Sequence, residues 1–332
     1  MNSEKKRTLG SFYTQGNPFL LDPFINWAET LPTQTKFLEP FAGNGQIPKL
    51  LTEAGFDFSW DSFDIDPEIK GVISQDTLSS FPQGYACTIT NPPYLSYHFA
   101  KRKGINLPKE YFLGYPSLYL RAIKEALDNC DFVAMIIPES FITSGYFRER
   151  LTSFISLPFQ MFNDTEMPTC LALWNPISTG EEFEVWRENI FIGNYAQLSK
   201  SFSEKPCVER IHFNVLDGQI GLKAIDNTVG PSIAFCDPSE IDANKIKISA
   251  RLVSRIYIDN LTSSQELIDL ANRRLEIWRQ STQDVLLTAF KGIRKDGQFR
   301  RRLDFANARL ILADSLCELE GHNHHFQESL AI

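Results

Sequence analysis

Lys36-Phe37-Leu38-Glu39-Pro40-Phe41-Ala42-Gly43-Asn44-Gly45 is the part of the chain that says most about its architecture. An apolar run ends in a turn of small residues, and an amphipathic segment (residues 46–54) follows it. Small residues let a backbone approach a ligand closely, and a helix that starts after them offers free N–H groups. This order therefore indicates a ligand-binding α/β sheet, although the same turn also suits any tight strand-to-helix connection.

The first half of the chain alternates short apolar runs with amphipathic segments, which is typical of a parallel sheet with helices on both faces. We predict a Rossmann-like, open, mostly parallel seven-stranded sheet with strands at 36–41, 60–65, 71–74, 85–90, 132–137, 159–162 and 169–174. Helices are predicted at 17–30, 46–54, 117–129 and 145–156. The later sequence indicates mixed β structure and then, from 263 to 319, mainly helix. We therefore expect a catalytic domain at 1–176 and a target-recognition region at 177–332.

A second polar turn, Asp64-Ile65-Asp66-Pro67, ends the second predicted strand about 20 residues beyond the glycines. A carboxylate at that distance in an α/β unit usually holds a ribose diol. Asp64 is the better ribose candidate, because Asp66 before a proline also suits a helix N-cap. Asp76 follows the third predicted strand and either accepts a hydrogen bond from an adenine amino group or occupies a surface turn.

A third polar turn, Asn91-Pro92-Pro93-Tyr94, follows the apolar run at 85–90. The Asn91 side-chain oxygen and the Pro92 carbonyl could accept both hydrogens of a planar amine, and Tyr94 could stack on its ring. The two prolines stiffen the loop and remove backbone donors. The carboxyl ends of parallel strands meet at one edge, so we expect all three turns to share one rim. An ordinary proline turn after a buried strand is the alternative.

In combination, these residues resemble the class I S-adenosylmethionine-dependent methyltransferases, and among them the bacterial adenine-N6 DNA methyltransferases of restriction–modification systems. The resemblance covers roughly residues 8 to 175. It is carried by Gly10-Ser11-Phe12-Tyr13-Thr14, Leu38 to Gly45, Asp64-Ile65-Asp66-Pro67 and Asn91-Pro92-Pro93-Tyr94. Gln15 stands where the family often has proline.

The resemblance implies S-adenosylmethionine as the cofactor and a target adenine that is flipped out of the duplex. It assigns cofactor binding to Phe12, Tyr13, Thr14, Glu39, Pro40, Phe41, Gly43, Gly45, Asp64, Ile65, Asp76 and Asn91. It assigns catalysis to Asn91, Pro92, Pro93 and Tyr94, with Phe162 as the second aromatic ring over the flipped base. Phe162 also suits a core strand position. A metal is not required, and His322, His324 and His325 have no partner ligands at suitable spacing.

The formal net charge of -8 means that any contact with nucleic acid must come from local basic patches. One candidate is the segment Lys101-Arg102-Lys103, close after the proposed catalytic turn, and its alternative is a solvated loop. The other candidate is Arg300-Arg301-Arg302 within the basic stretch 291–309, whose alternative is a surface paired with acidic neighbours.

The composition is that of a globular protein with a substantial core, and the six scattered cysteines suggest reduced thiols in a cytoplasmic protein without a membrane segment. We expect a site-specific DNA adenine-N6 methyltransferase that acts on double-stranded DNA. A separate restriction endonuclease could act on the same site. An RNA adenine-N6 or a protein glutamine-N5 methyltransferase is the alternative, because both substrates present a similar planar nitrogen.

Overall fold

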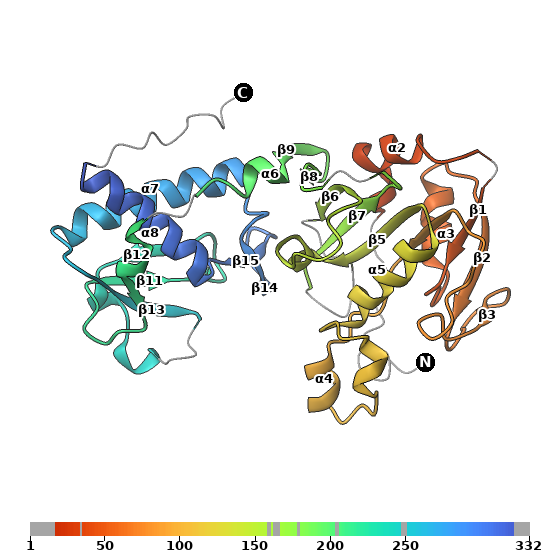
Figure 1. Cartoon of the computed structure of the whole chain (residues 1–332), viewed down its shortest axis with the longest axis horizontal. Helices are drawn as coiled ribbons and strands as arrows, with labels where there is room; N and C mark the ends of the chain where they lie inside the picture. Colours follow the sequence, from red (N-terminus) through yellow and green to blue (C-terminus); the bar gives the residue numbers. More distant parts are fainter. Residues whose placement is uncertain are drawn as a thin grey trace. The chain divides into compact units, whose positions relative to one another are not determined.

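A nine-stranded sheet forms the centre of the first of two units, Met1–Tyr195 and Ala196–Ile332 (Figure 1). The structure is a computed structural model that describes residues 17–33, 35–157, 161, 167–177, 180–202, 206–246 and 251–321, apart from the side chains of Pro206 and Lys291. Within this part of the chain, no helix is both long enough and apolar enough to cross a membrane.

The strand order of the large sheet is β3-β2-β1-β4-β5-β7-β6-β8-β9. Neighbours from β3 to β5 are parallel, whereas β7 runs antiparallel to both β5 and β6. The predicted fold class, an open and mostly parallel Rossmann-like sheet, is confirmed, but the predicted number of seven strands is wrong. The sheet has nine strands, because β6, β8 and β9 also pair into it. The strands are β1 (Lys36–Glu39), β2 (Ser59–Asp64), β3 (Ile73–Ser74), β4 (Cys87–Thr90), β5 (Phe132–Pro138), β6 (Leu151–Leu157), β7 (Thr169–Trp174), β8 (Glu184–Arg187) and β9 (Ile190–Asn194).

Burial explains the central strands. All of β4 is buried, and so is β5 apart from its first residue, which is why both strands are apolar runs without alternation. The Thr88 hydroxyl donates to the Leu38 carbonyl at 2.9 Å and satisfies a buried polar group between β4 and β1. The contact between β4 and β1 is therefore stabilised in the interior.

Helices connect the strands of this unit. Gly45 precedes α3 with a left-handed φ of 72°, a backbone conformation that favours glycine. The elements are η1 (Pro18–Leu20), α2 (Asp22–Ala28), α3 (Gln46–Glu53), α4 (Tyr97–Arg102), η2 (Lys109–Phe112), α5 (Leu118–Asn129) and η3 (Glu139–Thr143), and α6 (Tyr195–Leu198) starts at the last residue of the unit.

The helix predicted at 145–156 is wrong. Residues Leu151–Leu157 form strand β6, which pairs with β7 on one side and β8 on the other. Both faces of β6 are covered, so its apolar residues do not alternate with polar ones. Without that alternation, periodicity alone does not distinguish the strand from a helix. Phe147 also has a left-handed φ of 52°, which interrupts any helix before this strand.

The division between the units falls after Tyr195 and not near 176. Strands β8 and β9 lie beyond the expected boundary and still pair into the large sheet, β8 in parallel with β6. The first unit therefore includes a hairpin that composition alone had placed in the second region.

The second unit combines a four-stranded antiparallel sheet, of order β10-β13-β11-β12, with two long helices and a hairpin. Its strands are β10 (Ile211–Phe213), β11 (Ile220–Lys223), β12 (Ala234–Cys236), β13 (Val253–Ile258), β14 (Thr288–Ile293) and β15 (Phe299–Arg302). Its helices are α7 (Ser264–Thr282) and α8 (Phe305–Leu319), with the short turns η4 (Pro206–Arg210), η5 (Pro238–Glu240) and η6 (Ala243–Lys245). The hairpin β14–β15 interrupts the region that the sequence predicted as mainly helical.

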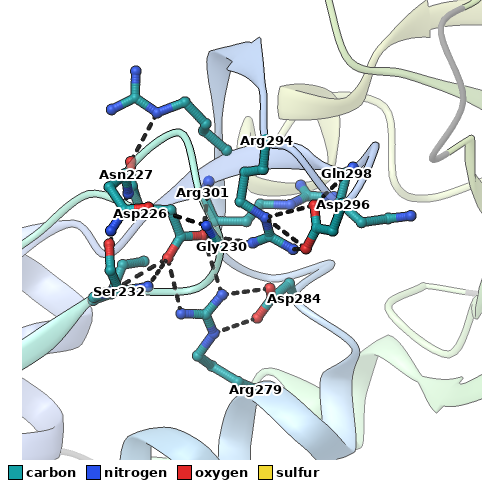
Figure 2. A network of polar contacts seen from close by, with 12 residues as sticks. Asp226, Asn227, Gly230, Ser232, Arg279, Asp284, Arg294, Asp296, Gln298 and Arg301 are labelled. Carbon is teal, nitrogen blue, oxygen red and sulfur yellow. Dashed lines mark hydrogen bonds and ion pairs between the residues drawn. The ribbon is translucent and has the colours of Figure 1, made fainter.

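A buried carboxylate, Asp226, joins the hairpin to the rest of the second unit (Figure 2). Arg279 of α7 donates to both of its oxygens at 3.1 and 3.2 Å, and Arg294 donates to Oδ2 at 2.9 Å. Burial alone would raise the pKa of Asp226, but Arg279, the Ser232 N–H and the charge of Arg294 lower it below its ordinary value. The ion network therefore keeps the carboxylate charged inside the unit.

Replacing Asp226 with asparagine should strongly destabilise the second unit. The change leaves two buried guanidinium groups without their shared carboxylate, a loss of about 3–5 kcal/mol in the free energy of unfolding. Urea denaturation measures this loss. As a matched control, Asp296→Asn removes an Arg294 partner that is 42% exposed and should cost less than about 1 kcal/mol. Equal losses in the two variants would contradict this account of the network.

Candidate active site

A cavity of about 180 Å³ opens at the carboxyl ends of β1, β2 and β4. The glycine turn, the Asp64 turn and the proline turn all contribute to its wall, so they face one cavity, as the sequence predicted. The residues that line it are Glu39, Phe41, Ala42, Gly43, Asn44, Gln46, Ile47, Asp64, Ile65, Asp76, Thr77, Leu78, Asn91, Pro93, Leu95, Leu107, Tyr111 and Leu118.

Asp64 holds the glycine turn against the end of β2. Its Oδ2 accepts from the Gly43 N–H at 2.8 Å, and its Oδ1 accepts from the Asp66 N–H at 2.9 Å. The Ala42 N–H donates to the Phe63 carbonyl at 2.8 Å and continues this attachment. Asp64 therefore shapes the turn as well as lining the cavity. A carboxylate has about four lone-pair positions, so these two bonds leave capacity for a ligand hydroxyl.

Glu39 places a second carboxyl group in the wall. The residue is 1% exposed, and its Oε2 has no hydrogen-bond partner among the described residues. Burial raises the pKa of Glu39 well above its ordinary value, and the neighbouring charge of Asp64 raises it further. A cationic or hydrogen-donating ligand group would satisfy this oxygen.

The third wall is built around Asp76, which accepts from the Tyr111 hydroxyl at 2.8 Å and from the Ser79 hydroxyl at 2.6 Å. The guanidinium of Arg121 lies 4.6 Å from the centre of the Tyr111 ring and donates to the carbonyls of Tyr111 and Leu78. Sequence reasoning missed Tyr111 and Leu107. They follow no strand, and only packing of the segment before α5 brings them to the cavity.

The side chain of Asn91 is oriented by Tyr94. The Tyr94 hydroxyl lies 2.7 Å from Asn91 Oδ1 and 2.7 Å from the Ile136 carbonyl, so it can donate to either acceptor. Tyr94 is 7% exposed, and its ring meets Tyr119 edge-on at 6.3 Å. Burial raises the pKa of Tyr94 well above its ordinary value, which keeps the hydroxyl protonated as a donor.

Four of the predicted site residues support the cavity without lining it. Pro92 is buried, Tyr94 points toward Asn91 and β5, and the Pro40 carbonyl accepts from the Thr77 hydroxyl at 2.8 Å. Gly45 forms the turn into α3. The predictions that lie outside the described residues concern Phe12, Tyr13, Thr14, Phe162, His322, His324 and His325.

The two predicted basic patches differ in exposure. Lys101, Arg102 and Lys103 are exposed at the end of α4. Arg301 is only 3% exposed, because its strand turns it into the second unit near Asp226, so the expectation of a surface contact at this position is corrected. Arg300 is half-buried, donates to the Asp226 carbonyl and lies 5.3 Å from the centre of the Phe290 ring. Arg302 is also half-buried.

The charge of the wall limits what the cavity can bind. Glu39, Asp64 and Asp76 line it, and none of the described lining residues is Lys, Arg or His. A dinucleotide, whose pyrophosphate carries negative charge, would lie beside Asp64 and Asp76 without a cation in the described wall to offset its charge. A ligand with a ribose diol and a positive charge fits better, and S-adenosylmethionine carries both, as a sulfonium and an ammonium group.

Comparison with known proteins finds no matching family model and no curated protein of similar sequence. Solved structures that resemble the chain include the type I restriction-modification system methyltransferase subunit from Streptococcus thermophilus, with 14% identity and a TM-score of 0.36 over 57% of this chain and 51% of that one. The type IIG restriction endonuclease BpuSI matches with 14% identity and a TM-score of 0.39 over 54% of this chain and 27% of its own. The M protein of the type I restriction enzyme EcoKI matches with 11% identity and a TM-score of 0.36 over 93% of this chain and 71% of its own.

The chain spans about half the length of the first structures that it matches.

Replacing Glu39 with glutamine should change how stability depends on pH. Because the folded-state pKa of Glu39 is raised, the free energy of unfolding falls as pH rises from the unfolded-state value of about 4.3 through the folded-state value. Glutamine does not titrate, so Glu39→Gln should gain stability relative to the wild type between about pH 4 and about pH 8. Urea denaturation at both pH values measures the difference. A difference in the free energy of unfolding between Glu39→Gln and the wild type that stays constant with pH would contradict a raised pKa of Glu39.

Proposed function

We propose that this protein is an S-adenosylmethionine-dependent methyltransferase that modifies the exocyclic N6 amine of adenine in double-stranded DNA. The observation that carries the proposal is one cavity lined at once by Gly43, Asp64 and Asn91. It brings a cofactor-type turn, a ribose-type carboxylate and an amine-binding amide to the same edge of the sheet.

The cofactor would be held by residues of all three walls. Asp64 would accept from the ribose hydroxyls, and the apolar side chains of Ile65, Leu78 and Leu118 would enclose the adenine. The buried Glu39 Oε2 would accept from the ammonium end, directly or through water. When bound, S-adenosylmethionine supplies an electrophilic methyl group on its sulfonium.

Asn91 would prepare the target nitrogen for attack. An adenine amino group is a poor nucleophile, because its lone pair is delocalised into the ring. Acceptors at Asn91 Oδ1 and the Pro92 carbonyl would hold its two hydrogens, favour a localised lone pair and stabilise the positive charge that develops on nitrogen. The nitrogen would take the methyl group from the sulfonium, S-adenosylhomocysteine would leave, and one amine proton would be lost to solvent. This chain needs no covalent intermediate for such a transfer.

Tyr94 would first serve as the residue that orients Asn91, through the hydroxyl 2.7 Å from Asn91 Oδ1. Stacking of its ring on a flipped adenine remains a prediction, and it requires the ring to become more exposed than the 7% found here. The Phe162 ring is the predicted cover for the other face of the base.

Nucleic acid is favoured over a protein substrate by the second unit of 137 residues and by the exposed cations at the end of α4. An RNA adenine-N6 methyltransferase is the second candidate, since the amine-binding groups would be the same, and protein glutamine-N5 methylation is the third. If the substrate is DNA, the protein would be the modification component of a restriction–modification system, with a separate endonuclease acting on the same site.

The proposal is tested by incubation with labelled S-adenosylmethionine and, in parallel, mixed-sequence duplex DNA, RNA and protein. We expect the label in DNA and its recovery as N6-methyladenine after nucleoside analysis. Label in RNA or in protein glutamine would replace the proposed substrate. Absence of cofactor binding in calorimetry would remove the proposal altogether.

Two substitutions separate chemistry from cofactor binding. Asn91→Ala should lower the rate of methyl transfer by about 10²- to 10³-fold, because a preorganised acceptor is lost, with little change in cofactor affinity. Tyr94→Phe keeps the ring and removes the hydroxyl, so we expect about a tenfold loss of rate, worth one hydrogen bond. Single-turnover kinetics measures both rates. An unchanged rate in Tyr94→Phe would leave the ring, and not the hydroxyl, as the functional part of Tyr94.

A further inference from the structure

Residues 96–117 form an inserted segment between the proline turn and α5. Its two ends lie side by side, because Ser96 and Ser117 form an isolated antiparallel bridge. The Tyr97 N–H donates to the Pro116 carbonyl at 3.0 Å, and the Leu118 N–H donates to the Leu95 carbonyl at 2.9 Å. Figure 1 shows α4, near the start of this segment, standing apart from the large sheet. The segment is therefore attached through one narrow base.

The segment has its own apolar packing, which continues into the cavity wall. Phe112 is 1% exposed and meets the Tyr97 ring edge-on at 5.5 Å. The cluster that contains Phe112 and Ala100 also contains three leucines that line the cavity, Leu78, Leu95 and Leu118. Close-packed interiors transmit strain, so we expect a displacement of the segment to reach this wall.

Two side chains of the segment reach the cavity itself, Leu107 and Tyr111. Tyr111 is fixed there through its hydroxyl bond to Asp76 and through the Arg121 guanidinium over its ring. Desolvation raises the pKa of Tyr111, and Asp76 raises it further, so the hydroxyl stays protonated as the donor of this bond. Any ligand in the cavity is therefore partly enclosed by the segment.

The same segment carries a concentrated positive charge. Lys101, Arg102 and Lys103 are exposed at the end of α4, and Glu110 is the only acidic residue between 96 and 117. Arg102 and Lys103 lie over the Phe99 ring, at 5.4 and 6.0 Å from its centre, which limits their freedom. Residues 196–332 hold equal numbers of basic and acidic residues, so the net charge of -8 belongs to the first unit. Within that acidic unit, a polyanion is attracted to this segment.

We propose that residues 96–117 bind the phosphate backbone of duplex DNA and thereby strengthen the hold of the cavity on the cofactor. This inference rests on the proposed function. A duplex that immobilises the cations also immobilises Leu107 and Tyr111, because one packed body carries both surfaces. By thermodynamic linkage, the cofactor must tighten DNA binding by the same factor.

The coupling is measured with S-adenosylhomocysteine, which has no methyl group to transfer, so that binding is observed without turnover. Its Kd is determined by calorimetry without DNA and at saturating mixed-sequence duplex. We expect binding to be about fivefold tighter, or more, in the presence of the duplex. The Kd of the duplex, measured with and without S-adenosylhomocysteine, should shift by the same factor.

Charge reversal locates the effect. The triple variant Lys101→Glu, Arg102→Glu, Lys103→Glu should bind S-adenosylhomocysteine normally in the absence of DNA. It should bind duplex more weakly, with a shallower salt dependence, and lose the mutual tightening. Lys49→Glu, at an exposed cation of α3, is the matched control and should retain the coupling.

Equal affinities for S-adenosylhomocysteine with and without bound duplex would overturn the inference while leaving the methyltransferase proposal intact. Failure of the wild-type protein to bind duplex, or full coupling in the triple variant, would also overturn it. Failure to bind S-adenosylhomocysteine at all would instead contradict the proposed function on which the inference rests.

Discussion

The parallel pairing of β1 with both β2 and β4 is the constraint on which the candidate site depends. Because the three strands run in the same direction, their carboxyl ends meet at one edge, and each end carries a different polar turn. The hydrogen bond from the Thr88 hydroxyl to the Leu38 carbonyl and the burial of β4 keep β4 beside β1, and backbone pairing keeps β2 on the other side of β1. The order of the strands thus brings together functional groups that no single turn could provide.

Each unit contains a buried carboxyl group, and the surroundings of the two groups favour opposite charge states. In the second unit, Asp226 is surrounded by donors and stays charged, so it serves to hold a hairpin in place. In the first, Glu39 faces a cavity, its Oε2 has no hydrogen-bond partner in the described part of the chain, and burial favours its neutral form. Burying a polar group without a hydrogen-bond partner costs free energy. Such groups usually persist at sites where a ligand supplies the missing partner.

The sequence predicted the parts of the site that depend on short-range order. Asn91 directly follows β4, Asp64 is the last residue of β2, and Gly43 lies in the turn after β1, so a correct sheet places them together. It did not predict β6, because a strand covered on both faces has no alternation that distinguishes it from a helix. Tyr111 and the burial of Arg301 were missed for a related reason, since both depend on tertiary packing between segments distant along the chain.

Because residues 96–117 are attached through one narrow base, the length of this segment can change without a change in the sheet. The chain leaves and returns at neighbouring positions, Ser96 and Ser117, so an excursion of another length could close on the same pair. Insertions and deletions there would alter the rim above the cavity while β4 and α5 keep their places. The site can in this way acquire a new outer surface without any rebuilding of the strands beneath it.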